Sequence, residues 1–161
     1  MSRTSRTSPA NSGELADAFL TASRALAGLA VRSLNAAPVE VTLPQHRLLV
    51  LLSTGGEQTV GALAQQFEVN PSNASRLCDR LQRLGLVSRD RSARDGRAVD
   101  VALTAAGREL LETVRAHRRH EIQRVLDGMS HVDVGAAVQA LTAFGDAAHE
   151  LGEAQWTVHA S

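Results

Sequence analysis

Apolar residues recur every three or four positions over most of the chain, which is the spacing of one face of an α-helix. This pattern predicts six helices, over about residues 14–35, 42–52, 59–67, 70–84, 105–127 and 131–151. Between the fourth and fifth helices, the segments LVSRDR and AVDVAL alternate apolar and polar residues, which predicts two β-strands. The intervening SARDG supplies turn-forming residues, so the two strands are expected to form a hairpin.

Helix-capping residues stand where several of these helices are expected to begin. Thr42 is followed by Pro44 in the first turn and by Gln45 at the third helical position, which is a capping-box pattern. The third, fourth and fifth helices follow other residues of the capping type, namely Thr59, Asn70 and Thr104. Ser130 with Asp133 resembles another capping box, ahead of the last helix. The pattern as a whole predicts a mainly α fold with one small β-hairpin.

Composition narrows the class of protein. Hydrophobic residues make up 43% of the 161 residues but aromatic residues only 2%, so we expect an aliphatic core between closely packed helices. The single cysteine excludes an intramolecular disulfide. No stretch approaches the roughly 20 apolar residues of a membrane span, and the N-terminus lacks the apolar segment of a signal peptide. A cytoplasmic protein with no membrane partner is therefore expected.

Charge is distributed unevenly, although the formal net charge is zero. Seven arginines lie between Arg76 and Arg97, against three acids, whereas the chain from Ser130 onward carries four acids and no arginine. A neutral total does not exclude a nucleic-acid partner, because binding depends on a local basic surface. The middle of the chain is where such a surface is expected.

The third and fourth predicted helices are short and are joined by a tight turn, which is typical of a helix-turn-helix. In that motif, the start of the second helix enters the major groove of DNA. Helical spacing turns Ala74, Leu77, Leu81 and Leu84 toward a core. Polar residues that can donate to base edges or phosphates lie on or beside the outer face, namely Ser72, Asn73, Ser75, Arg76 and Arg80.

The hairpin that follows turns this motif into a winged helix-turn-helix. It carries four arginines, Arg89, Arg91, Arg94 and Arg97. A hairpin tip with arginines can reach a neighbouring minor groove, where narrow A·T-rich DNA concentrates negative potential. Asp95 and Gly96 are expected to shape the tip, and Asp95 is a candidate to orient an arginine by a charged hydrogen bond.

These segments resemble the MarR family of bacterial regulators. The resemblance is carried by the LA…F.V.PS..SRL.DRL...GLV.R run, the D-G-R of the wing and the LT..G that opens the next helix, and it extends over about residues 14–151. It implies a homodimer joined through its terminal helices that binds a palindromic operator on double-stranded DNA, usually as a repressor. It places Ser72, Asn73, Ser75 and Arg76 on the recognition helix, and Asp95 and Arg97 at the signature pair of the wing.

Together, the sequence pattern and the resemblance predict a division of the chain into five segments. These are a disordered head (1–13), an N-terminal dimerisation helix (14–41), the winged helix-turn-helix lobe (42–104), C-terminal dimerisation helices (105–151) and a tail (152–161). Many relatives release DNA when a small phenolic or aromatic acid binds between the dimer region and the lobe. Arg32, His46 and Arg47 are candidate ligands for the carboxylate of such an effector.

Three alternatives remain beside this interpretation. Cys78 could sense oxidants, although its inward position favours a small hydrophobe. His117, His120 and Glu121 could hold a metal with His46, although two histidines at this spacing do not make a site, and we expect neither a metal nor another cofactor. A winged helix could also act through protein partners alone. An enzyme is not expected, because the sequence has no glycine-rich phosphate loop, no G-x-S-x-G and no H-E-x-x-H.

Overall fold

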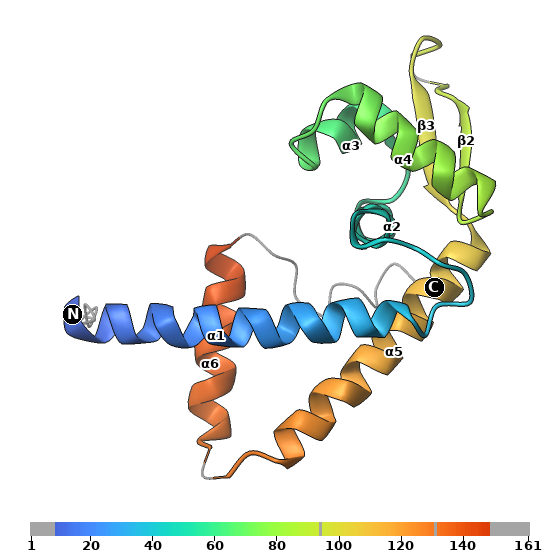
Figure 1. The fold of residues 1–161 in the computed structure, drawn as a ribbon. Coiled ribbons are helices and arrows are strands. Elements are labelled where there is room, and N and C mark those ends of the chain that lie inside the picture. The colour runs from blue at the N-terminus through green and yellow to red at the C-terminus, as the bar shows by residue number, and fades with distance from the viewer. Residues whose placement is uncertain (1–8, 94, 131, 149–161) are drawn as a thin grey trace.

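A computed structural model describes residues 9–93, 95–130 and 132–148 (Figure 1). These residues form nine elements in the order α1 (Pro9–Leu34), α2 (Leu43–Gly55), β1 (Gln58–Thr59), α3 (Val60–Gln66), α4 (Pro71–Arg83), β2 (Val87–Arg91), β3 (Val99–Leu103), α5 (Ala105–Asp127) and α6 (Val134–Ala147). The prediction of a mainly α fold with a small β wing is confirmed. None of the helices in the described part is long and apolar enough to span a membrane.

The molecule has two parts that α5 connects (Figure 1). One part is a lobe made of α2, α3, α4 and the sheet. The other is an open frame, in which α1 crosses α5 and α6 crosses α1. The winged helix-turn-helix lobe is therefore flanked by the N-terminal and C-terminal helices, as predicted.

Side-chain caps fix the beginnings of four helices in the lobe and at its exit. Thr42 Oγ1 accepts from the backbone N–H of Gln45 at 3.4 Å, and Gln45 Oε1 accepts from the Thr42 N–H at 2.8 Å, so the predicted capping box is confirmed. The other predicted caps are also confirmed. In each, the side-chain oxygen of the cap accepts a hydrogen bond from the backbone N–H three residues later, at 3.1 Å for Thr59, 2.9 Å for Asn70 and 3.1 Å for Thr104.

Several element boundaries differ from the prediction, among them the end of α2, which continues to Gly55 and does not stop at about residue 52. Helix α1 begins at Pro9, so residues 9–13, which were assigned to a disordered head, are helical, while 1–8 lie outside the described residues. Helix α6 is capped by Asp133, whose carboxylate accepts from Ala136 N at 3.0 Å, and not by Ser130. Its described part ends at Ala147, and the predicted residues 149–151 and the tail 152–161 fall outside the described range.

The wing sheet contains one strand more than the predicted hairpin. Its order is β1-β3-β2, all antiparallel, with Gln58 opposite Val101 and Arg89 opposite Val101 on the other side. Strand β1 has only two residues, so its own sequence carries no alternation that could have revealed it. Its pairing makes β3 the central strand and ties the hairpin to the segment between α2 and α3.

The core lies in the lobe and in the first half of α5. It is aliphatic, as the composition predicts, and its fully buried members include Leu48, Leu49, Leu52, Leu63, Leu81, Val101, Leu110 and Val114. Recognition-motif residues Ala74, Cys78 and Leu81 are buried, and Leu77 and Leu84 are partly buried. The predicted inward face of α4 is thus confirmed.

Helix α5 leaves the lobe through a close backbone contact. The Thr104 hydroxyl donates to Gly85 O at 2.7 Å, and Thr104 N donates to Leu86 O at 3.1 Å. Gly107 is buried against the same segment, and a Cβ atom there would overlap Leu86 O and lie 2.7 Å from Leu103 Cδ1. A glycine is therefore needed for the first turn of α5 to pack this closely.

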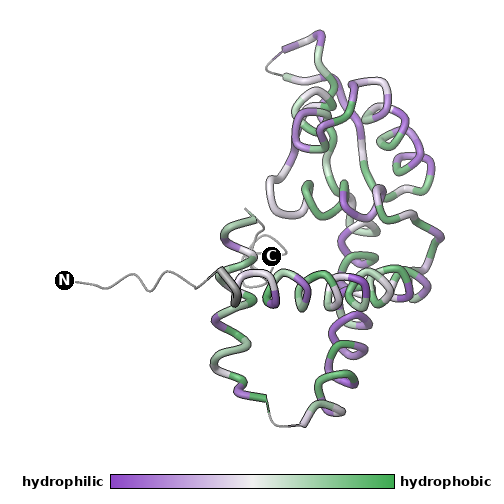
Figure 2. The backbone as a smooth tube through the Cα atoms, turned by 60° about the vertical axis from the view of Figure 1, so that its left-hand side comes forward, coloured by the Kyte–Doolittle hydropathy of each residue, from purple (hydrophilic) through white to green (hydrophobic). Residues whose placement is uncertain are grey.

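The frame, in contrast, leaves large apolar residues exposed. Figure 2 shows hydrophobic positions recurring along its helices. Within the described chain, α6 has no buried residue, and its contact with α1 includes stacked rings of Phe19 and Phe144, 4.4 Å apart. The large apolar residues exposed on α1, α5 and α6 include Leu15, Leu20, Leu26, Val125, Leu126, Val134, Val138, Leu141 and Phe144.

Candidate nucleic-acid interface

Helices α3 and α4 form the helix-turn-helix. Phe67 ends α3, and Glu68 adopts a left-handed backbone conformation with φ 53°, which reverses the chain before Asn70 caps α4. Pro71 occupies the first turn of α4, where its missing N–H costs no helical hydrogen bond. The turn therefore sets the direction in which the start of α4 points.

The polar residues predicted on the outer face of α4 are exposed, with one exception. Ser72, Asn73, Arg76 and Arg80 are open to solvent, whereas Ser75 is partly buried. Arginine, asparagine and serine side chains can donate to base edges and phosphates. The exposed four are thus free to face DNA, and Ser75 has a neighbour within the protein.

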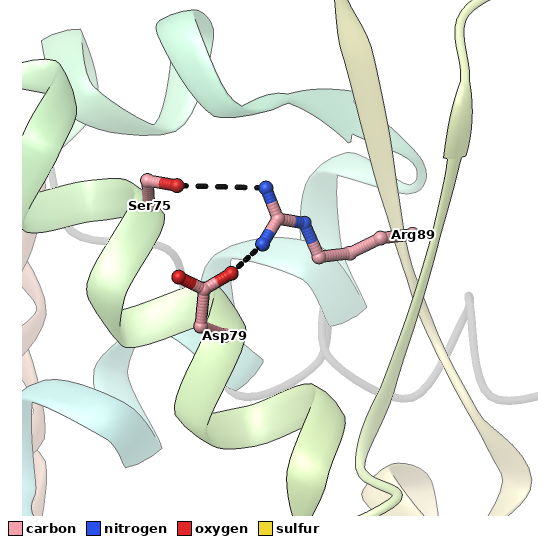
Figure 3. A network of polar contacts seen from close by, with 3 residues as sticks. All are labelled: Ser75, Asp79 and Arg89. Carbon is pink, nitrogen blue, oxygen red and sulfur yellow. Dashed lines mark hydrogen bonds and ion pairs between the residues drawn. The ribbon is translucent and has the colours of Figure 1, made fainter.

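That neighbour is Arg89 of β2 (Figure 3). Its Nη1 forms an ion pair with Asp79 Oδ1, and its Nη2 lies 3.5 Å from Ser75 Oγ. The Arg89 side chain is 16% exposed and that of Asp79 is 50% exposed. Sequence reasoning grouped Arg89 with the DNA-facing arginines of the wing, whereas the structure turns it toward α4. Asp79 is the single acid of α4, and this was the feature of the sequence that could have indicated its ion pair with Arg89.

The wing tip is built by local hydrogen bonds of Asp95. Its Oδ1 accepts from the backbone N–H of Arg97 at 3.0 Å, and its carbonyl accepts from Ala98 N at 2.8 Å. Asp95 therefore shapes the tip, as predicted, through the backbone of Arg97. The side chains of Arg91 and Arg97 are exposed. Arg94 lies outside the described residues.

Cys78 lies on the buried face of α4 and is fully buried. Burial raises the pKa of its thiol, although the positive charge of Arg89 acts in the opposite direction. A thiol that stays protonated and is shielded from solvent reacts slowly with oxidants. The redox-sensor alternative finds no support in this environment.

The three residues that the sequence offered as candidates to bind an effector lie in different places. His46 is buried and lines a cavity of about 290 Å³ between α2 and α5. Arg47 lines a separate open groove beside Asn73 and Arg76, and Arg32 is exposed and lines neither hollow. The sequence therefore identified residues that the fold does not bring together.

The cavity beside His46 is rich in arginine. Three arginines of α5 line it with apolar and polar neighbours, the full set being His46, Arg115, Arg118, Arg119, Ile122, Gln123 and Leu126. Arg118 Nε also donates to the buried Ser33 Oγ of α1 at 3.0 Å. The sequence analysis did not identify these arginines, although their spacing in RAHRRH places all three on one face of a helix.

His46 is uncharged at neutral pH in this environment. Burial, followed by the charges of Arg118 and Arg47, lowers its pKa from 6.5 to about 4. It can therefore accept or donate a hydrogen bond to a ligand, but it cannot attract a carboxylate as a cation.

The residues considered for a metal are not gathered into a site. Within the described ranges, no group of three or more His, Cys, Asp or Glu side chains could hold a metal ion. His117 and His120 are exposed, and Glu121 forms an ion pair with Arg124 at 3.1 Å.

Comparison with known proteins gives a consistent result. A model of the MarR family matches residues 40–98, from three residues before α2 to the wing. The Bacillus subtilis transcriptional repressor MdtR is 30% identical over 108 residues, or 67% of this chain and 70% of that protein. An uncharacterised B. subtilis regulator, YfiV, is 28% identical over 65% of each chain. The chain thus spans about two thirds of the length of these curated relatives.

Solved structures share the fold over most of the chain. The crystal structure of RV1404 from Mycobacterium tuberculosis is 34% identical with a TM-score of 0.80, covering 92% of this chain and 99% of that one. Streptococcus pneumoniae FabT, solved in complex with DNA, has a TM-score of 0.65 over 84% of this chain and 96% of its own. At 19% identity, FabT shows a shared fold alone.

Proposed function

The chain belongs to the MarR family of DNA-binding transcriptional regulators, and we propose that it acts as a homodimeric repressor of a palindromic operator. Its family makes it a regulator and not an enzyme. The repressor assignment is drawn from similarity to proteins named as repressors, B. subtilis MdtR and Pseudomonas putida IacR, the latter 25% identical. The observation that carries the proposal is the exposed polar face of α4 next to an arginine-bearing wing.

In the proposed complex, α4 enters the major groove. Ser72, Asn73 and Arg76 are exposed on its first two turns, where side chains of a recognition helix meet base edges. Arg80 lies one turn further and suits a phosphate. Arg91 and Arg97 of the wing supply contacts to the backbone and to the flanking minor groove.

The exposed frame supports the homodimer. A single chain leaves Val138, Leu141 and Phe144 of α6 more than half exposed, together with apolar residues of α1 and α5. Contiguous apolar surface of this kind usually marks an interface. A second copy can bury it by interlocking its own terminal helices, which also places two recognition helices for two half-sites, about 34 Å apart.

The arginine-lined cavity supports control by a small aromatic acid. Arg119 can pair with a carboxylate, while Ile122 and Leu126 offer an apolar wall for a ring. The cavity lies between α2 of the lobe and α5, so an occupant can change how the lobe sits on α5. Benzoate is the simplest probe of this proposal. It should weaken DNA binding by the wild type and have no effect on DNA binding by Arg119→Ala. Equal responses of both proteins would exclude this cavity as the binding site.

Binding to DNA from upstream of its own gene tests the main proposal. We expect tight binding that falls steeply as salt rises, because arginine–phosphate contacts release counterions, and weaker binding to unrelated DNA. Arg97→Ala should lower the affinity several-fold, or about 1–2 kcal/mol, by removing a wing contact. Arg24→Ala, an exposed arginine of α1 outside the lobe, is the matched control and should bind as the wild type does.

The alternative is a winged helix that acts through protein partners. Such a protein would show no sequence preference and no more than a shallow salt dependence. That outcome, or an Arg97→Ala protein with unchanged affinity at matched salt, would contradict the proposed mode of DNA binding.

A further inference from the structure

Arg89 joins two elements that must act together on DNA (Figure 3). Its backbone lies in β2, opposite the fully buried Val101 of the central strand, so its starting point is fixed by the sheet. Its guanidinium ends at α4, in an ion pair with Asp79 and 3.5 Å from Ser75 Oγ. Ser75 and Asp79 are four residues apart, so they lie on one face of the helix and hold the same group.

We propose that Arg89 is a positioning residue that fixes the wing at a set separation from the recognition helix, so that both enter their grooves together. This inference rests on the proposed DNA binding. The hairpin is anchored at its base, where Val87 is buried with Leu81 of α4 in the core. Arg89 adds a second link, two residues further toward the tip. Two contacts along a strand fix the direction of that strand relative to α4, whereas a single contact would let the strand rotate about it.

The chemistry of the three groups requires arginine at this position. A planar guanidinium presents two parallel donors, which can reach a carboxylate and a hydroxyl at the same time. A lysine ammonium is a point charge and cannot span both acceptors in a fixed orientation. With Asp79 half exposed, the ion pair itself adds little stability, so its value lies in geometry.

The pair also removes an unfavourable charge from the DNA-facing helix. Asp79 lies between the exposed Arg76 and Arg80, and its carboxylate would repel phosphates if it were unpaired. Ser75 accepts from Arg89, so the hydroxyl proton of Ser75 is directed away from the guanidinium and stays available for DNA. The predicted contact of Ser75 is therefore one that Arg89 orients.

A distance measurement without DNA tests the link directly. Spin labels at Ser72→Cys on α4 and Ala93→Cys on the wing, in a Cys78→Ala background, report their separation by pulsed electron resonance. Labelled chains are diluted into unlabelled protein so that signals within one chain dominate. We expect one narrow distribution for this protein and a clearly broader one after Arg89→Lys. Arg91→Lys, the next arginine of the same strand and exposed, is the matched control and should leave the distribution narrow.

A second readout links the geometry to function. Arg97→Ala should lower DNA affinity several-fold with Arg89 in place but less than about two-fold in the Arg89→Lys background, because a displaced wing no longer makes that contact. Asp79→Asn keeps an acceptor and removes the charge, so it should retain most of this coupling. An equal effect of Arg97→Ala in both backgrounds, or a narrow distance distribution after Arg89→Lys, would overturn the positioning role.

The two proposals fail in different ways. The first case is a wild-type protein that gives a narrow distance distribution but binds all DNA sequences equally. This result would refute the proposed function, and with it the role of Arg89 in binding. Specific DNA binding together with an unaffected distribution in Arg89→Lys would refute the positioning role alone. Thermal unfolding of each variant within a few degrees of its parent excludes loss of the fold as the cause.

Discussion

His46 is the residue whose titration the fold changes most clearly. It is 6% exposed and close to two arginines, which together with burial lower its pKa from 6.5 to about 4. The folded protein therefore keeps it neutral, whereas the unfolded chain protonates it below about pH 6.5. Because the folded pKa lies below the unfolded one, the associated stability is complete above 6.5 and is lost as pH falls toward 4.

We expect this residue to make the free energy of unfolding depend on pH. Between pH 6.5 and 4, protonation of His46 in the unfolded state should cost the wild type up to about 3 kcal/mol. His46→Gln should lose less over the same interval, since glutamine does not titrate. The measurement is urea unfolding at several pH values and fixed protein concentration. Parallel curves for the two proteins would show that His46 is not buried in neutral form.

Residue-scale predictions from the sequence succeeded where the signal is local. Thr42, Thr59, Asn70 and Thr104 cap their helices because a cap depends on residues two or three positions away. The direction of Arg89 depends on a partner on another element, and the sequence pattern placed it with the DNA-facing arginines instead.

At the scale of elements, the junction between the wing and α5 requires a residue without a side chain, which is Gly107. Gly107 packs against the backbone of Leu86 and the side chain of Leu103, at the point where α5 leaves the sheet. The backbone cannot move here without disturbing the hydrogen bonds of Thr104 to Gly85 and Leu86. Packing of this kind tolerates no added methyl group.

Gly107→Ala should therefore destabilise the protein by about 2–4 kcal/mol, despite the higher helix propensity of alanine. Gly61→Ala is the matched control, because a Cβ atom there meets its nearest neighbour at 3.9 Å and should be neutral or slightly stabilising. Urea unfolding followed by circular dichroism compares the two. Equal stabilities would mean that α5 is free to shift relative to the wing.

The elements that the sequence could not delimit are those without a periodic signal. Residues 9–13 extend α1 without an apolar face, and β1 is a two-residue strand that exists through its pairing with β3. The candidate cavity shows the same limit, because His46 and Arg119 come to line one hollow through the packing of α2 on α5. The winged lobe, in contrast, was predictable because each of its longer elements has its own periodicity and cap.

At the scale of the whole molecule, the exposed apolar residues of the frame are the surface that the proposed homodimer would bury. Leu141 is 57% exposed near the middle of α6, among the apolar residues that we assign to the homodimer interface. An aspartate at this position would place a charge in a desolvated interface without a partner.

We therefore expect Leu141→Asp to weaken dimerisation at least ten-fold and to lower operator affinity with it. Gln139→Asp adds the same charge at an exposed polar position of the same helix and is the control. Sedimentation velocity over a range of concentrations measures the change. A Leu141→Asp protein that sediments as the wild type does would place the interface elsewhere.

The run of α5 from the lobe into the frame has a mechanical consequence. This helix has 23 residues, so it is about 34 Å long at 1.5 Å per residue. Acting as a lever, it turns a tilt of about 10° at the frame into a displacement of about 6 Å at the lobe, half the width of a major groove. In the homodimer that we propose, the fit of two lobes to two half-sites would therefore be controlled by an angle set far from the DNA, and a small change at the frame end of α5 would be enough to lose that fit.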